Sequence, residues 1–480
     1  MYPWKSLDNA MVFTVYTSVN DAYVPLILDF IYDTYVLPLG KRIIHVEKAR
    51  DFIGEFLRFT IALENGFINV EVRAFKILEF TISWDGLVDK SIVNRIREDL
   101  IIAVRMFEDN FRRSSIFLTF VENSSPIPER FKARSRVIER IFTDSMILFF
   151  AFFLVINMII FAISPFYAPI IIVLFQFCIL LCSHKIIMKL GDWKITAESQ
   201  NVTVVQYHLF PDEYRMVLDM IRVKGRDWLY QVKHEIYEKT LAQNRSLDLN
   251  VIADVLHKNG IFFRPEDLQI KTINIYRLVK EASEEFNLPM PRVVISNTII
   301  PNAAASGVGP KFGVVMITTG LLTTLEEGEI YAVINHELSH LKGRDPVILF
   351  ALSAFEYLFR LYVLLPIAPI LFFIPFLYFF FIMSAIFFVG KFLEAKSDLE
   401  AAIKTRQPQL LAESLRKIGY NRLRLERSSE FRFESWLGWD PHPPISFRIN
   451  RLENLEDLDS IKHPLLRSIS DVIKGFIKSF

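Results

Sequence analysis

Long uncharged apolar segments alternate with polar segments along the chain. Residues 146–163 and 167–183 each approach the length that a helix needs to cross the hydrocarbon core of a bilayer. Ser164 and Pro165 interrupt the apolar pattern between them. Because backbone polar groups in lipid must bond internally, we expect two helices joined by a tight turn, which form a transmembrane hairpin.

A second apolar stretch, residues 346–390, is long enough for two crossings, with a turn near Pro366 and Pro369. It contains Glu356 and Arg360, whose i, i+4 spacing places them on one face of a helix. This pair could neutralise itself within the structure, or it could line a polar chamber in the membrane. The two stretches together predict about four transmembrane helices.

Basic residues flank both apolar stretches, whereas the turn within each hairpin contains none. The flanking residues are Arg130, Lys132, Arg134, Arg136, Arg140, Lys185, Lys189, Lys342, Arg344, Lys391 and Lys396. Because basic loops favour the cytoplasm, we expect both termini and all sizeable polar segments on the cytoplasmic side of a cell membrane. We expect no removable signal peptide, since the first residues lack a basic region followed by an apolar core.

Residues 1–140 carry strand and helix patterns without a chemical motif. Residues 57–63 and 67–73 flank Asn65-Gly66, a dipeptide typical of a two-residue β-hairpin turn. Further strands are expected at 78–84 and 116–121, and an amphipathic helix at 91–107. These patterns predict a small α+β module of unknown role.

The polar segment after the first hairpin mixes both kinds of element. The pattern predicts strands at 201–207 and 292–296, and helices at 211–223, 228–240, 273–286 and 322–335. His234-Glu235 begins like a metal-binding motif, but the second histidine is missing. We therefore assign it to a solvated helix face.

The composition narrows the class of protein. Hydrophobic residues make up 52% of the chain and charged residues 23%, which excludes a disordered chain. A formal net charge of +1 gives no field that would favour nucleic acid. The only cysteines, Cys178 and Cys182, lie in an apolar run, so they are interpreted as packing residues and not as a disulfide framework.

The sequence His336-Glu337-Leu338-Ser339-His340 is the motif that carries chemistry. On a helix, residues i and i+4 share one face, so the two imidazoles can bind one zinc ion. The glutamate beside the first histidine can then reach a water molecule at the metal. We expect Glu337 to take the proton of that water as a general base and to pass it to the leaving amine.

A catalytic zinc needs a third protein ligand and one open position. Glu394, just beyond the second apolar stretch, can complete a site of two histidines and one glutamate. Asp398, one turn further, can accept the N–H of a ligand histidine and so orient its ring. Glu400 is a weaker candidate for the third zinc ligand.

The joint order of four segments resembles the HtpX-like zinc metallopeptidases, a group that includes the CAAX-type prenyl endopeptidases and the Oma-type proteases. These segments are residues 301–307, 314–322, 336–345 and 394–398. The resemblance covers about residues 140–455 and implies a mostly helical gluzincin-type domain with a small sheet, one Zn²⁺ per chain. It also implies cleavage of damaged or misfolded membrane proteins on the cytoplasmic side.

The resemblance also suggests how substrate binds. It implies a substrate-binding loop at Asn302 and Ala303 beside an edge strand that contains Val314 and Met316, where a peptide would add as a further strand. The family's usual phenylalanine is replaced here by Ala304, which changes the shape of the local pocket.

Two C-terminal positions match the family as well. His442 is then a candidate donor to the tetrahedral intermediate, and Arg448 is a structural cation or a cation on the oxyanion side.

We expect residues 465–480 to form an amphipathic helix that lies on the membrane surface or caps the core.

We thus predict an α+β fold in an organisation of five segments. They are a module at 1–140, a hairpin at 141–184, the first part of a peptidase domain at 185–345, a second hairpin at 346–390, and its second part at 391–480. The expected partners are the lipid bilayer and membrane-protein or unfolded polypeptide substrates. Two alternatives stay open: a CAAX-type prenyl-protein endopeptidase, and a zinc-binding transporter or sensor. The intact motif argues against an inactive adaptor.

Overall fold

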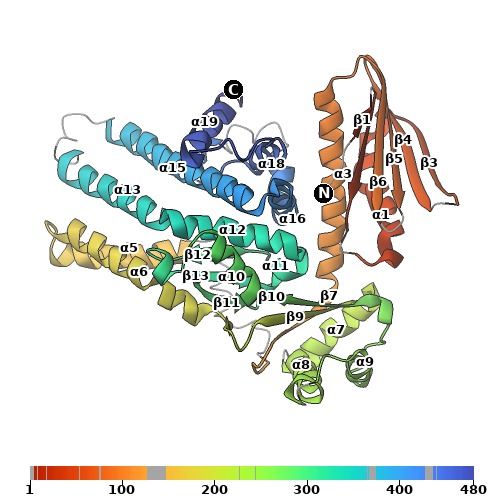
Figure 1. The fold of residues 1–480 in the computed structure, drawn as a ribbon, viewed down its shortest axis with the longest axis horizontal. Helices are drawn as coiled ribbons and strands as arrows, with labels where there is room; N and C mark the ends of the chain where they lie inside the picture. Colours follow the sequence, from red (N-terminus) through yellow and green to blue (C-terminus); the bar gives the residue numbers. More distant parts are fainter. Residues whose placement is uncertain are drawn as a thin grey trace. The chain divides into compact units, whose positions relative to one another are not determined.

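The computed structural model divides the chain into two units, whose elements are traced in Figure 1. It describes residues 5–7, 9–17, 19–52, 54–74, 77–126, 147–225, 227–243, 245–364, 366, 374–426, 436–438 and 440–479. The first unit comprises Met1–Leu118, Val205–Val223 and Leu247–Ile270; the second comprises Thr119–Val204, Lys224–Ser246 and Lys271–Phe480. The first unit therefore ends earlier than the expected module at 1–140 and takes in two later segments. Residues 127–140 of that module lie outside the described part.

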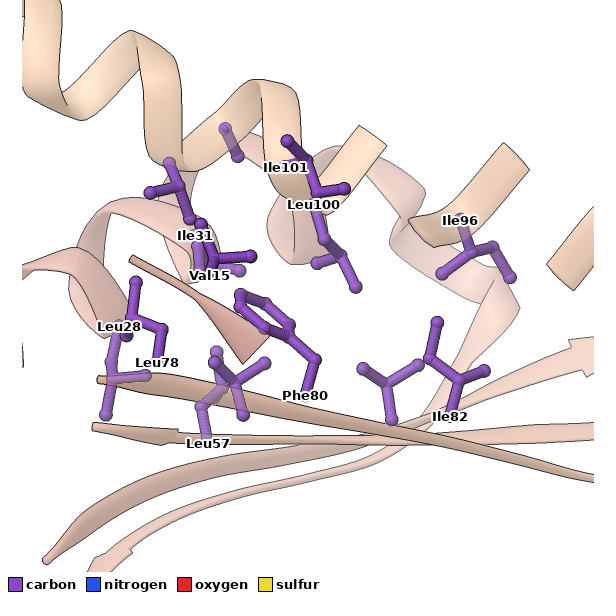
Figure 2. Close-up of a cluster of buried hydrophobic side chains, with 14 of the residues drawn as sticks. Val15, Leu28, Ile31, Leu57, Leu78, Phe80, Ile82, Ile96, Leu100 and Ile101 are labelled. Atoms are coloured by element: carbon purple, nitrogen blue, oxygen red, sulfur yellow. The ribbon is translucent and has the colours of Figure 1, made fainter. Parts of the chain in front are cut away.

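A six-stranded antiparallel sheet, in the order β1-β2-β6-β5-β4-β3, forms the first unit's frame. Its strands are β1 Lys5–Leu7, β2 Ala10–Val15, β3 Ile43–Arg50, β4 Glu55–Leu63, β5 Gly66–Ala74 and β6 Leu78–Gly86. One face is apolar because alternate residues such as Ile68, Val70 and Val72 point inward. Helices α1 (Val24–Ile31) and α3 (Lys90–Arg113) cover that face, as Figure 2 shows for part of the core.

The hairpin between β4 and β5 turns one residue earlier than the sequence suggests. Leu63 pairs with Gly66, so Glu64 and Asn65 form the turn and Gly66 already belongs to the strand. A Cβ atom on Gly66 would lie 2.2 Å from the backbone oxygen of Asp85. The glycine is therefore required by the close approach of β6, and not by the turn itself.

The segment Asp21–Arg42 is long and apolar enough to cross a membrane by length and composition. It includes α1, the π-helix η2 (Tyr32–Val36) and α2 (Leu37–Leu39), flanked by the short turns η1 (Asp21–Tyr23) and η3 (Gly40–Arg42). Four of its side chains are fully buried in the core under the sheet: Val24, Ile27, Leu28 and Ile31. Because these four side chains contribute to the core of the first unit, we assign this face of the segment to that core.

Four helices of the second unit contain the predicted membrane stretches. They are α5 Ile147–Ile163, α6 Ala168–Leu190, α13 Asp345–Phe359 with its extension η7 Arg360–Leu364, and α15 Ile374–Thr405. Among the described residues, Ala168–Leu190 and Asp345–Leu364 are long and apolar enough to cross a bilayer. Helix α5 has 17 residues, and the first part of α15 is apolar as far as Gly390. The chain thus has candidate membrane helices, while four crossings stay a prediction; the turn residue Pro369 lies outside the described part.

The charged pair in the second apolar stretch neutralises itself. Arg360 Nε donates to Glu356 Oε1 at 2.7 Å, and the Glu356 side chain is buried. This contact matches the structural interpretation of the pair and not the polar chamber.

A four-stranded sheet in the order β12-β13-β11-β8 lies in the second unit. Its strands are β8 Trp193–Ile195, β11 Arg292–Ser296, β12 Ala303–Ser306 and β13 Val314–Thr318; β11 and β13 are parallel and the other pairs antiparallel. A second sheet, β10-β9-β7, consists of β7 Ser115–Val121, β9 Asn201–His208 and β10 Leu268–Asn274. Each of these three strands contains a point at which the chain passes from one unit to the other.

Nine further α-helices belong to the described part of the chain. They are α7 Pro211–Lys224, α8 Asp227–Lys239, α9 Leu249–Lys258, α10 Ile275–Glu285, α11 Thr319–Thr324, α12 Glu327–Gly343, α16 Pro408–Glu426, α18 Ile445–Glu453 and α19 Pro464–Ile477. The expected helix at 322–335 is split into α11 and α12. The split arises because Glu326 caps α12: its carboxylate accepts from the backbone of Glu329, whose side chain accepts from Glu326 N at 2.7 Å.

Candidate metal centre

Helices α12 and α15 bring three potential ligand atoms to one point. His336 and His340, one turn apart on α12, direct their Nε2 atoms to within 3.1 Å of each other. Glu394 on α15 places Oε2 at 3.5 Å from His336 Nε2 and Oε1 at 3.4 Å from His340 Nε2. Among the described residues, these side chains form the group of three that could hold a metal ion, with ligand atoms within 4.8 Å of one another.

The spacing of these atoms fits zinc. Bonds of about 2.0–2.2 Å in tetrahedral geometry separate neighbouring ligand atoms by roughly 3.3–3.6 Å. The two imidazole Nε2 atoms are 3.1 Å apart, and each of them lies close to a different oxygen of Glu394, at 3.5 Å for His336 and 3.4 Å for His340. Glu394 Oε2 is buried and accepts no hydrogen bond from the described residues. A cation at this point would satisfy an oxygen that otherwise carries a desolvation cost.

Each histidine of the site is backed by an aspartate and a cation. Asp398 Oδ1 lies 3.0 Å from His336 Nδ1. Arg448 holds the same carboxylate from behind with two parallel bonds, Nε to Oδ2 at 2.8 Å and Nη2 to Oδ1 at 2.7 Å. Such a fork fixes the carboxylate, which in turn leaves Nε2 of His336 facing the metal position.

His340 has an equivalent support from the chain just beyond α12. Its Nδ1 lies 2.8 Å from Asp345 Oδ2. Lys396 Nζ donates to both oxygens of Asp345, at 2.7 and 2.8 Å, and both side chains are buried. The turn that brings Asp345 back toward His340 passes through Arg344 in the left-handed conformation, with φ of 53°.

The third support belongs to His442, which approaches Glu394 from a loop. His442 Nδ1 lies 2.7 Å from Asp440 Oδ1, and Arg422 Nη1 lies 2.6 Å from Asp440 Oδ2. His442 Nε2 is 3.5 Å from Glu394 Oε1. The buried Lys391 ammonium bonds to the backbone oxygen of Asp440, which anchors this loop on α15.

The electrostatics of the site favour an ionised Glu394 carboxylate and protonated His336 and His442. Burial alone lowers the pKa of His336, but Asp398 and Glu394 outweigh it and raise that pKa to about 10. Burial raises the pKa of Glu394, but the neighbouring His442 and His340 hold it well below its usual range. The Glu394 charge in turn raises the pKa of His442. The Glu394 carboxylate therefore lies within a group of imidazoles whose charges favour its ionised form.

Residues 269–456 match peptidase family M48. Over this segment the chain is similar to M48 peptidases. It contains α12, the site-forming part of α15 and the loop of His442, so all three histidine supports belong to the matched region.

Curated relatives support the same assignment over a shorter stretch. A protease HtpX homolog of Thermodesulfovibrio yellowstonii is 45% identical over 74 residues, which is 15% of this chain and 26% of the relative. HtpX homologs of Burkholderia cenocepacia and Paraburkholderia phytofirmans are 48% and 49% identical over 73 residues, with the same shares covered. The chain thus spans about a quarter of the length of the relatives it matches.

Strand β12 forms one edge of the four-stranded sheet, and this corrects the expectation that Val314 and Met316 lie on an edge strand. Strand β13 pairs with β12 on one side and β11 on the other, and both side chains are buried. A strand paired on both sides offers no free backbone to a peptide. Asn302 anchors the start of β12, since its N–H donates to Thr318 Oγ1 at 2.8 Å.

The edge strand also contacts the candidate base. Ala305 N donates to Glu337 Oε2 at 2.7 Å. The N–H of Ala305 therefore points away from β13, and by the alternation of an antiparallel ladder the polar backbone groups of Ala303 point the same way.

The contacts of Arg448 and Glu400 bear on the roles expected for them. Arg448 is buried and bonds to both oxygens of Asp398, as expected of a structural cation, while its role at the substrate stays a prediction. Glu400 accepts from Ser339 Oγ at 2.7 Å and pairs with Lys342 at 3.2 Å. It is thus engaged away from the two imidazoles.

The sequence analysis missed Asp345, Lys396, Asp440 and Arg422. Asp345 lies five residues after His340, and Asp440 lies two residues before His442. An aspartate at short range from each candidate histidine was the available signal. Lys396 and Arg422 have no such sequence signal, because they lie on helices far along the chain from the aspartates with which they pair.

We expect Gly343→Ala to weaken zinc binding. A Cβ atom there would lie 2.3 Å from both Asp345 Oδ1 and Lys396 Nζ, so the pair that supports His340 must move. Loss of such outer partners typically costs about 10–100-fold in metal affinity. Zinc titration against a competing chelator measures the change. Gly328→Ala, at an exposed position of the same helix, is the control and should leave the affinity unchanged.

Zinc affinity should also rise with pH. With a pKa of about 10, His336 in the metal-free protein holds a proton at neutral pH that zinc must displace. Below that pKa, each unit of rising pH increases the deprotonated fraction about tenfold, and the affinity follows. Titrations across the neutral range test this. An affinity independent of pH would show that His336 is not a ligand that must lose a proton.

Proposed function

We propose that this protein is a zinc-dependent endopeptidase at the rim of a membrane, acting on unfolded or misassembled membrane proteins. The observation that supports it most is the convergence of two imidazoles and the Glu394 carboxylate close to Glu337, which contacts the half-buried edge strand β12. The M48 match and the similarity to HtpX homologs point to the same activity.

The peptide would bind as a strand added to β12. The backbone groups of Ala303 and Ala305 face away from β13, so an extended chain can pair with them. An added strand would take over the N–H of Ala305, which would release the Glu337 carboxylate. Substrate binding would thereby free the base at the moment it is needed.

Bound zinc would supply a Lewis acid that acidifies water and polarises the scissile carbonyl. Glu337 takes a proton from the attacking water at its carboxylate and returns it to the leaving nitrogen. His336, His340 and Glu394 would hold the ion, and Asp398 and Asp345 keep the two rings turned toward it.

His442 is placed to donate a hydrogen bond to the carbonyl oxygen of the scissile peptide. Its Nε2 lies 3.5 Å from Glu394 Oε1, and its side chain is partly exposed. The Glu394 charge raises the pKa of His442, which favours the protonated form. A fixed imidazolium would stabilise the negative charge that develops on the carbonyl oxygen.

Membrane placement follows from the continuity of the helices. Helix α13 begins at Asp345, five residues after His340, and the apolar part of α15 ends at Gly390, four residues before Glu394. At 1.5 Å per residue, the metal position would lie within roughly 10 Å of the membrane boundary. We propose that this boundary is the cytoplasmic one, from the basic residues that flank both stretches.

The test is chelator-sensitive proteolysis by the purified full chain in lipid vesicles. An unfolded polypeptide and a destabilised membrane protein should both be cleaved, 1,10-phenanthroline should stop cleavage, and added zinc should restore it. Cleavage confined to a farnesylated peptide would identify a prenyl-protein endopeptidase instead. Metal flux without any cleavage would support a transporter and refute the peptidase.

A further inference from the structure

A group of partly exposed aromatic residues, which we call the rim cluster, surrounds the end of the apolar part of α15. It consists of Phe388 and Phe392 from α15, Phe447 from α18 and Phe476 from α19. They pack against the buried side chains of Trp436 and Val472. Aromatic residues gather where a membrane protein passes from hydrocarbon to water.

Helix α19 runs antiparallel to α15 and carries its own C-terminal end toward the membrane. Arg451 links the two helices, because it donates to Ser468 Oγ of α19 at 2.8 Å and to the backbone oxygen of Ala395 in α15. One step further along, the rings of Phe476 and Phe388 are 5.1 Å apart. Later residues of α19 therefore lie beside earlier residues of α15.

The last two turns of α19 combine exposed apolar and basic side chains. Ile473 and Ile477 are exposed, and Lys474 and Lys478 follow each of them directly. Such side chains suit the bilayer surface, where the isoleucines enter the acyl boundary and the lysines reach the phosphates.

We propose that this end of α19, together with the rim cluster, binds the acidic phospholipid headgroup region of the bilayer that α15 crosses. Two observations select lipid as the occupant: the rim cluster adjoins the apolar part of α15, and the charged side chains in the last two turns of α19, Lys474 and Lys478, are positive. The inference rests on the proposed crossing by α15. Through Arg451 and Ala395, this contact would fix the height of Glu394 above the bilayer.

The experiment uses single-cysteine variants of the full chain in vesicles, with Cys178 and Cys182 replaced by serine. A polarity-sensitive fluorophore is attached in Ile477→Cys, Leu466→Cys or Phe381→Cys. Leu466 is the matched control, since it is 64% exposed against 63% for Ile477 but lies 11 residues earlier on the same helix. Phe381, 66% exposed in the apolar part of α15, reports the crossing itself.

Spin-labelled lipid should quench the probes at positions 381 and 477 several-fold more than the probe at 466, which iodide should quench from water. In phosphatidylcholine vesicles, adding phosphatidylglycerol should increase lipid quenching at 477, and Lys474→Gln with Lys478→Gln should remove that increase. Persistence of the increase in the double variant would overturn the role of the lysines.

Three outcomes overturn the proposal. If 477 behaves like 466 while 381 is quenched by lipid, α19 stands clear of the bilayer. If 477 is protected from both quenchers, a second copy of the chain covers it. If iodide reaches 381, α15 does not cross and the premise fails. Peptidase activity of the same preparations reports the enzymatic proposal separately.

Discussion

Replacing Glu337 with glutamine is expected to abolish peptide cleavage while zinc stays bound. Glu337 does not belong to the group of potential ligands, and its carboxylate accepts from Ala305 N at 2.7 Å. A glutamine oxygen can accept the same bond, so β12 should keep its position. The amide cannot take a proton from water, and loss of a general base typically slows the reaction about 10²–10⁴-fold.

The measurement is the turnover rate together with zinc content for each purified variant. Glu327→Gln is the matched control, because Glu327 lies in the first turn of the same helix and pairs at the surface with Arg277. It should keep full activity and zinc. Wild-type turnover by the glutamine variant at position 337 would show that another group takes the proton.

The ligand set could be read from the sequence because its core is local. Two histidines spaced i and i+4 meet on any helix, and this geometry needs no knowledge of the fold. Glu394 required the order of motifs, since α15 approaches α12 only through tertiary packing. The supports Lys396 and Arg422 were not predictable, because nothing near them in the sequence links them to an aspartate on another element.

The edge of the sheet was assigned to the wrong strand for a physical reason. Residues Ala303–Ser306 lack the branched and aromatic side chains typical of strands, whereas Val314–Thr318 has them. The resemblance implied a loop at Asn302 and Ala303 beside an edge strand at Val314–Thr318, and the side chains of 303–306 gave no pattern that would have corrected it. Small side chains suit an edge on which another backbone must approach closely.

Two of the basic residues that were used to infer the membrane orientation, Lys391 and Lys396, are buried. Lys391 and Lys396 both flank the second apolar stretch, but each is buried and bonded, to the Asp440 backbone and to Asp345. Their positions are explained by the site as well as by the membrane. The cytoplasmic placement is therefore carried mainly by the other flanking residues.

Replacing Glu394 with alanine should remove zinc itself, a loss of a different kind from that at Glu337. The change leaves two imidazoles and takes away the one carboxylate that faces both of them, at 3.5 and 3.4 Å. Zinc content should fall below one per chain. The thermal stabilisation by zinc should vanish with it; in the wild type it should amount to about 2.7 kcal/mol at a zinc concentration about 100 times Kd.

Glu400→Ala separates this effect from a general loss of charge on α15. Glu400 lies six residues further along the same helix and is bonded to Ser339 and Lys342. Its replacement should leave zinc stoichiometry intact. If metal analysis found zinc in the variant at 394 and none in the variant at 400, the third ligand would be Glu400. The arrangement of α15 against α12 would then differ from the one described, and the supports of His336 and His340 would need reassignment with it.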